Sequence, residues 1–149
     1  HAEVAKFLGG YKISLHSGSD KFSVYPSVAH HTNGVLHVKT AGTSYLEALR
    51  VIALMDGKLF KTILDFSVSR YTIDKASYHV SAEMEKIPQN FASPAELLDN
   101  FDARQVFHVT YGSVLERFGS GIFEILKKNE VVYYKKLEKH FRHHIELLD

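Results

Sequence analysis

The stretch Lys12–Phe22, KISLHSGSDKF, decides how this sequence is interpreted. It opens with alternating apolar and polar residues, which is the pattern of a β-strand with one face buried, and a strand is predicted at Lys12–His16. Serine, glycine, aspartate and lysine follow, and such residues are typical of the turn after a strand. Polar and titratable side chains therefore gather at the carboxyl end of this predicted strand.

After this stretch, predicted strands and helices alternate along the sequence. A short helix is predicted at Val24–Thr32, with Pro26 in its first turn. Strands are predicted at Val35–Thr40 and Gln105–Tyr111, and a short strand or a helix end at Ser77–Ala82. Alternating strands and helices imply parallel strands with helical crossovers. The expected fold is α/β, with all 149 residues forming the C-terminal βα units of a larger TIM-type (β/α)8 barrel domain.

Helices are predicted from apolar residues at helical spacing and from capping signals. Two serine-to-glutamate capping boxes are expected, Ser44–Glu47 and Ser93–Glu96. The helices are expected at Ala2–Leu8, from Ser44 to the Asp56-Gly57 break, at Leu59–Ser77, after Ser93, and at Ile122–Leu148.

Composition bounds the class of protein. The 149 residues are 45% hydrophobic and 23% charged, as in a globular domain. The 18 basic and 17 acidic residues are mixed along the chain, so we expect no nucleic-acid partner. No apolar run is long enough to cross a membrane, and cysteine is absent, which fits a reducing cytoplasm. The first residues, HAEVAKFLGG, are typical of the end of a helix, which favours a piece of a longer protein.

Four of the ten histidines lie in predicted strands: His16, His37, His79 and His108. Alternation places each of His16, His37 and His108 opposite apolar neighbours, so we expect the three to open toward one cavity at the carboxyl ends of parallel strands. Converging imidazoles can hold a divalent ion, although a single strand histidine is more often a hydrogen-bonded core residue. The remaining clusters, His30-His31 and Arg142–His144, are expected on solvated helix surfaces.

Two interpretations fit the loop Ser17–Lys21. It can be a turn that caps a helix, or its hydroxyls and lysine can bind a hydroxylated, anionic substrate. Lys39 is expected on the inward face of a strand, where an unpaired charge is costly, and this makes it a binding candidate. No Gly-rich phosphate loop is present, so a nucleotide site is not predicted. The predicted substrate-binding residues are Ser17, Asp20, Lys21, Lys39 and His108.

Four segments, HSGSDKFSVYP, HVKTAGTSYLEALRVIA, YHVSAEMEKIP and ARQVFHVTYGSVL, resemble the tagaturonate epimerase family of hexuronate catabolism, in the same order. Proteins of this family are about three times longer, so the chain resembles their carboxyl-terminal third. The resemblance implies a metal-dependent barrel isomerase that interconverts D-tagaturonate and D-fructuronate, with a sugar-acid substrate and the rest of the same polypeptide as partners. His16 is the first candidate for a metal ligand and His37 the second, for an ion such as manganese, nickel, cobalt or zinc.

The two ketose acids differ at C4, which the C2 ketone does not acidify, so enolisation cannot invert that centre. Cleavage and re-formation of the C3–C4 bond by retro-aldol chemistry can invert it, and hydride removal at C4 is a second route. Two alternatives stay open: a metal-dependent sugar aldolase or ketose isomerase, and a sugar-acid-binding piece without turnover.

Overall fold

The structure is a computed structural model that describes residues 1–40, 42–78, 80–88 and 93–148. The chain divides into two compact units, His1–Thr43 with Leu137–Asp149, and Ser44–Lys136. We call them the sheet unit and the helical unit. Within the described residues, no helix is long and apolar enough to span a membrane.

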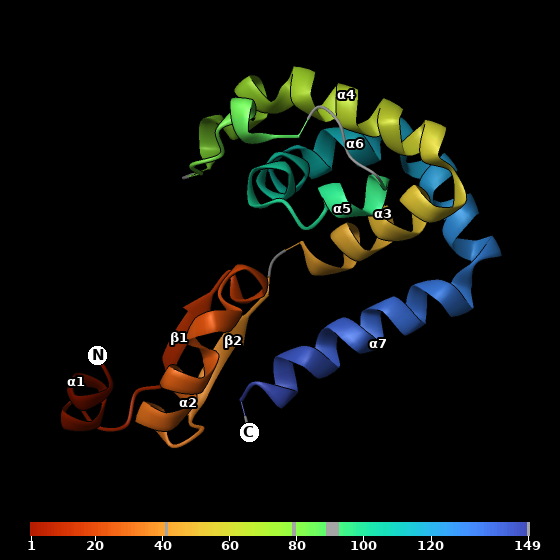
Figure 1. The fold of residues 1–149 in the computed structure, drawn as a ribbon. Helices are drawn as coiled ribbons and strands as arrows, with labels where there is room; N and C mark the ends of the chain where they lie inside the picture. Colours follow the sequence, from red (N-terminus) through yellow and green to blue (C-terminus); the bar gives the residue numbers. More distant parts are fainter. Residues whose placement is uncertain (41, 79, 89–92, 149) are drawn as a thin grey trace. The chain divides into compact units, whose positions relative to one another are not determined.

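The sheet unit is built around a β-α-β segment (Figure 1). The strands β1 and β2 pair in parallel, with Ile13 opposite Leu36 and His16 opposite Lys39. Asn33 closes the intervening helix in a left-handed conformation, at φ 50°, and turns the chain into β2. The elements of this unit are α1 (Ala2–Phe7), β1 (Ile13–His16), the 3₁₀ turns η1 (Gly18–Asp20) and η2 (Phe22–Val24), α2 (Tyr25–Thr32) and β2 (Leu36–Lys39).

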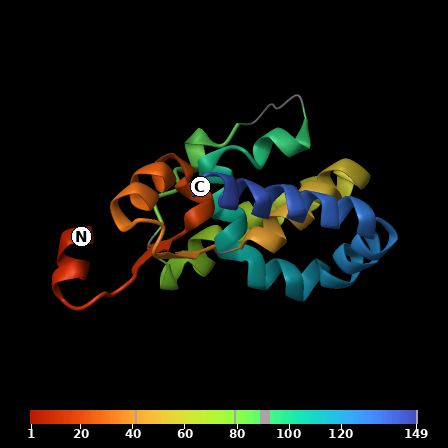
Figure 2. The same cartoon turned by 90° about the horizontal axis from the view of Figure 1, so that it is seen from below.

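The predictions for this part of the sequence are confirmed. The strands predicted at Lys12–His16 and Val35–Thr40 form and lie parallel, and the helix predicted at Val24–Thr32 begins one residue later. The predicted N-terminal helix also forms, as α1, and an extended segment that begins with Gly9 and Gly10 joins it to β1 (Figure 2). Both glycines have positive φ, which ends the helix.

The helical unit is built on the packing of α4 against α6. Phe60 and Phe107 are fully buried between them, with ring centroids 5.6 Å apart. The Asp56 carboxylate caps α4 by accepting from the Leu59 amide at 2.9 Å. The helices of this unit are α3 (Thr43–Met55), α4 (Gly57–Asp74), α5 (Pro94–Leu97) and α6 (Phe101–Lys128), with the 3₁₀ turns η3 (Lys75–Ser77) and η4 (Met84–Lys86). The last helix, α7 (Glu130–Glu146), begins in the helical unit, and from Leu137 on it belongs to the sheet unit.

The prediction of a strand at Gln105–Tyr111 is wrong, because these residues lie inside α6. The Asn100 side chain accepts from the Ala103 amide at 2.9 Å and starts the helix five residues before the predicted strand. The side chains buried along this stretch follow the helical period: Ala103, Val106, Phe107, Thr110 and Val114. In the described residues the sheet therefore has two strands, and the expected third strand is absent.

Other boundaries in the helical unit differ in detail. The long helix predicted at Ile122–Leu148 is interrupted at Asn129, whose side-chain amide donates to the Ile125 carbonyl at 2.9 Å. The capping box predicted at Ser44 is wrong, because α3 begins at Thr43 and Glu47 pairs with Arg50 instead. Ser93 does cap α5, accepting from the Ala95 amide.

The stretch Ser77–Ala82 was predicted as a short strand or a helix end. A 3₁₀ turn that ends at Ser77 supports the helix end. His79 lies outside the described residues, so its predicted place in a strand is not addressed.

Candidate functional site

The two strands place four polar side chains on one face of the sheet: Ser14, His16, His37 and Lys39, which we call the histidine face. Ser14 pairs in register with His37, and His16 pairs with Lys39. All four are exposed, whereas the alternating apolar residues are half-buried on the other face. The prediction that His37 and Lys39 share a face is confirmed, but Lys39 is not buried among the described residues.

One hydrogen bond orients the histidine face. Ser14 Oγ lies 2.9 Å from His37 Nδ1. A partner at one ring nitrogen sets the direction in which the other nitrogen points, as in many metal-binding histidines. His37 Nε2 is therefore the atom of this ring that remains to contact a ligand.

The loop that follows β1, which we call the strand-end loop (Ser17–Lys21), is tightly built. Ser17 has φ 55°, in the left-handed region, and two amide-to-carbonyl bonds of about 3 Å close the next residues into η1. A Cβ on Gly18 would stand 2.3 Å from the Tyr25 hydroxyl and 2.6 Å from Val38, so only glycine fits. The Lys21 ammonium donates to the His16 carbonyl at 2.9 Å. Ser17, Asp20 and Lys21, the three residues of this loop predicted to bind substrate, are exposed.

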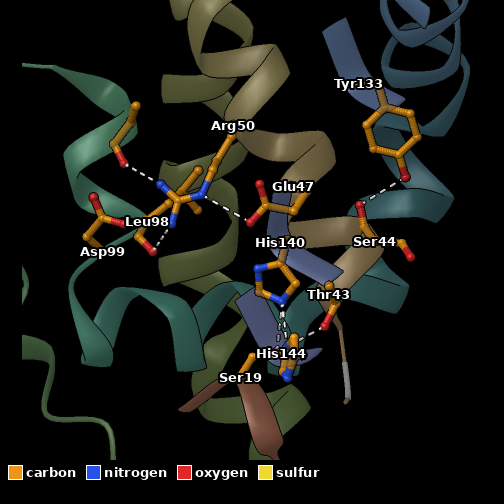
Figure 3. Close-up of polar contacts among 11 residues, drawn as sticks. Ser19, Thr43, Ser44, Glu47, Arg50, Leu98, Asp99, Tyr133, His140 and His144 are labelled. Carbon is orange, nitrogen blue, oxygen red and sulfur yellow. Dashed lines mark hydrogen bonds and ion pairs between the residues drawn. The ribbon is translucent and has the colours of Figure 1, made fainter. Parts of the chain in front are cut away.

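Ser19, in contrast to these exposed residues, is buried and is the centre of a polar network (Figure 3). Its hydroxyl lies 3.1 Å from each of three atoms: Thr43 Oγ1, His140 Nε2 and His144 Nε2. The two histidine Nε2 atoms are 3.0 Å apart. We call Ser19, Tyr25, Thr43, His140 and His144 the serine–histidine network.

Tyr25 completes this network from α2. Its hydroxyl lies 2.6 Å from His144 Nδ1, on the side of the ring opposite Ser19. Burial lowers the pKa of His144, and the nearby His143 lowers it further. The ring of Phe22 covers the group, with its centroid 4.6 Å from that of His144. His144 is therefore held as a neutral, oriented imidazole.

The serine–histidine network was not predicted. The sequence places Arg142–His144 on a solvated surface, which is confirmed for Arg142 and His143 and wrong for His144, whose exposure is 7%. The spacing of His140 and His144 is the signal that was available, because residues four apart share a helix face. His30 and His31 are exposed, as predicted.

His108 does not share the histidine face. It lies on α6, in the helical unit, where its ring makes an edge contact with Tyr78 at 6.1 Å. The expectation of three strand histidines around one cavity is wrong on this point, because the strand that was to carry His108 is a helix. Within the described residues, no group of three or more histidine, aspartate or glutamate side chains is placed to hold a metal.

A second polar cluster, in the helical unit, is centred on Arg50. The Arg50 guanidinium bonds Glu47 at 3.2 Å, Asp99 at 2.6 Å, and the carbonyls of Ala95 and Leu98 (Figure 3). Burial raises the pKa of Glu47, while Arg50 opposes that rise. The cluster ties α3 to the end of α5, which is a structural role.

A parallel β-α-β segment with polar groups at the strand ends is typical of α/β enzymes. Comparison with known proteins narrows this class, because residues 1–148 match the tagaturonate epimerase (UxaE) family. The chain therefore belongs to the tagaturonate epimerase family.

Two relatives illustrate the match. The chain is 46% identical over 155 aligned positions to a tagaturonate/fructuronate epimerase of Thermotoga maritima, which covers all of this chain and 32% of that protein. It is 38% identical to the crystal structure of the fructuronate-tagaturonate epimerase UxaE from Cohnella laeviribosi, with a TM-score of 0.90 over 99% of this chain and 32% of that one. The same similarity holds for a glycerol complex of that enzyme. The chain thus spans about a third of the length of these relatives.

Proposed function

We propose that the intact protein containing this chain is an isomerase that interconverts D-tagaturonate and D-fructuronate at C4. The observation that supports this most is the 46% identity to a tagaturonate/fructuronate epimerase, which extends over the whole chain. The proposed substrate is a small sugar acid, and the proposed compartment is the cytoplasm, where a cysteine-free chain fits.

We further propose that β1 and β2 are two neighbouring strands of a TIM-type barrel. Parallel strands are usually covered on both faces, whereas the histidine face is exposed among the described residues. The rest of the polypeptide would cover that face and complete the site. Side chains at the carboxyl ends of barrel strands form the site in such enzymes, and His16 and Lys39 occupy that position here.

The histidine face carries imidazole nitrogens, which are common ligands of divalent metal ions. His16 and His37 offer two imidazoles on one face, and Ser14 orients the second of them. These two residues would hold the ion, with further ligands from the rest of the polypeptide. When bound, a divalent cation stabilises negative charge that develops on substrate oxygens.

The retro-aldol reaction suggests which substrate groups the other polar residues would bind. Retro-aldol cleavage removes the proton of the C4 hydroxyl, turns C4 into an aldehyde, and leaves the electron pair of the C3–C4 bond on C3 and the C2 oxygen. Re-formation of the bond on the other face of the aldehyde inverts C4. The Lys21 and Lys39 ammonium groups would bind the substrate carboxylate, and Ser17 and Asp20 would bind its hydroxyls. His108 is not retained in this set, because its assignment depended on a strand that is a helix.

The test uses the full-length protein and D-tagaturonate, with products followed by NMR. Formation of D-fructuronate is expected, whereas accumulation of two three-carbon fragments would indicate an aldolase. Substrate deuterated at C4 separates the routes, because hydride removal gives a primary isotope effect and retro-aldol cleavage does not. Metal analysis of the purified protein, and loss of turnover on chelation, test the ion; full turnover without metal would contradict its role.

A further inference from the structure

The serine–histidine network lies directly behind the strand-end loop, and the proposed function does not use it. Ser19 stands between Gly18 and Asp20, in the middle of the run that carries the proposed ligand His16 and the proposed substrate-binding residues. Its side chain is buried at 8% exposure, while its neighbours Ser17, Asp20 and Lys21 are exposed. One buried hydroxyl therefore anchors a loop whose other polar side chains face outward.

The available protons determine which atoms donate and which accept in the hydrogen bonds of the serine–histidine network. Burial raises the pKa of Tyr25, so its hydroxyl keeps its proton and donates it to His144 Nδ1. The proton of a neutral His144 is then on Nε2, from which it is donated toward Ser19 Oγ or His140 Nε2. The single Ser19 proton is left for His140 or Thr43. The bond from Tyr25 to His144 therefore has a definite direction, and it requires a neutral His144 because only an unprotonated Nδ1 can accept it.

The backbone of the strand-end loop also packs closely against the serine–histidine network. The Tyr25 hydroxyl reaches His144 only because Gly18 lacks a side chain, since a Cβ there would stand 2.3 Å from that oxygen. Ser17, at φ 55°, has a left-handed backbone conformation that is strained for a residue with a side chain, and contacts elsewhere must offset this strain. Ser19 is the nearest buried residue along the chain with side-chain bonds that can do so. The contacts from α7 and α2 thus hold the loop from behind.

We propose that Ser19 and His144 are positioning residues that hold the strand-end loop in the shape in which Asp20 and Lys21 meet the sugar-acid substrate. This inference rests on the proposed function and extends it to the C-terminal helix, which carries His144. Neither residue needs to touch the substrate, because each acts on it through the loop backbone. His140 supports the arrangement as a second acceptor for Ser19.

The test compares two amides at position 144 of the full-length protein. His144→Gln places an amide nitrogen near the former Nε2 and keeps the bond to Ser19, whereas His144→Asn reaches toward Tyr25 and loses that bond. We expect His144→Asn and Ser19→Ala to raise KM for D-tagaturonate roughly tenfold, the equivalent of one or two lost hydrogen bonds. His144→Gln should stay within about threefold of the parent, and kcat should change little in all three.

Hydrogen exchange of the loop amides gives a second readout that needs no activity. Residues 17–21 should exchange faster in Ser19→Ala and His144→Asn than in the parent, but not in His144→Gln. Lys139→Ala, an exposed change on the same helix, is the control and should alter neither measurement. An active parent whose Asn and Gln variants share one KM would overturn the inference, as would equal exchange in all variants. An inactive parent with the expected exchange pattern would instead overturn the proposed function.

Discussion

Val35–Thr40 and Gln105–Tyr111 look alike in sequence and fold differently. Both alternate apolar and polar residues around a central histidine, VLHVKT in one and QVFHVTY in the other. The first contains β2 and places His37 on an exposed polar face, whereas the second lies inside α6 and places Val106 and Phe107 in a helical core. Alternation over six or seven residues therefore does not by itself distinguish a strand from a helix.

The difference between the two stretches lies in what surrounds them. Gly34, at φ 74°, turns the chain directly into β2 and prevents a helix from continuing. Asn100 instead starts a helix upstream of Gln105, and Gly112 does not end it, because α6 continues to Lys128. The capping of α6 and its packing against α4 outweigh the strand preference of a few β-branched residues.

The largest expected effect comes from Thr110, which a strand would place on the polar face beside His108. In α6 it is fully buried. Thr110→Asp should cost about 3–5 kcal/mol of unfolding free energy, because it buries an unpaired carboxylate. Thr72→Asp, on the exposed side of α4, is the control and should change stability by about 0.5 kcal/mol or less. Chemical unfolding followed by circular dichroism measures both, and equal stabilities would contradict the helical assignment.

The histidines of the histidine face and the helical His108 should also differ in function. His16→Ala, on the histidine face, should lower turnover of the full-length enzyme at least about a hundredfold and reduce bound metal, because a proposed ligand is lost. His37→Ala should act in the same direction, and His108→Ala should leave turnover within about threefold. Epimerisation rate, metal content and melting temperature are measured on each preparation. Full metal and near-normal turnover in His16→Ala would defeat the ligand assignment.

A smaller effect is expected at the start of α6. Asn100→Ala removes the side-chain cap and should cost about 1 kcal/mol, with faster hydrogen exchange in the first turns of the helix. Asn100→Asp keeps an acceptor at the cap and should recover most of the loss. If the two variants are equally destabilised, capping does not explain why this stretch is helical.

The smallest effect concerns pH and the buried His144. Because burial lowers its pKa in the folded protein, the unfolded chain takes up a proton first as pH falls below about 6.5. The free energy of unfolding should therefore decrease slightly below that pH and be highest above it. Among the residues that the structure describes, the titratable groups placed against His144 include Tyr25 from α2 and His140 and His143 from α7. His144→Gln should flatten this part of the profile, and an unchanged slope would show that other groups cause it.

The sheet unit could be predicted from sequence because its signals are local. Period-two alternation, the Asn33-Gly34 turn and the glycines after α1 act within a few residues of the elements they define. The shared face of His37 and Lys39 follows from alternation alone. The pairing of Ser14 with His37 does not, because it depends on the register between two strands 23 positions apart.

The sequence by itself determined the α/β class, the parallel pair β1 and β2, the family, and the position of polar residues at a strand end. Tertiary structure alone decided that Gln105–Tyr111 is helical, because packing of α6 against α4 outweighs local propensity. It alone joined Ser19 to His144, since 125 positions separate them and no local pattern records a contact over that distance. It also turned His144 from an expected surface residue into a buried one, because burial depends on which helix face meets Phe22 and Tyr25.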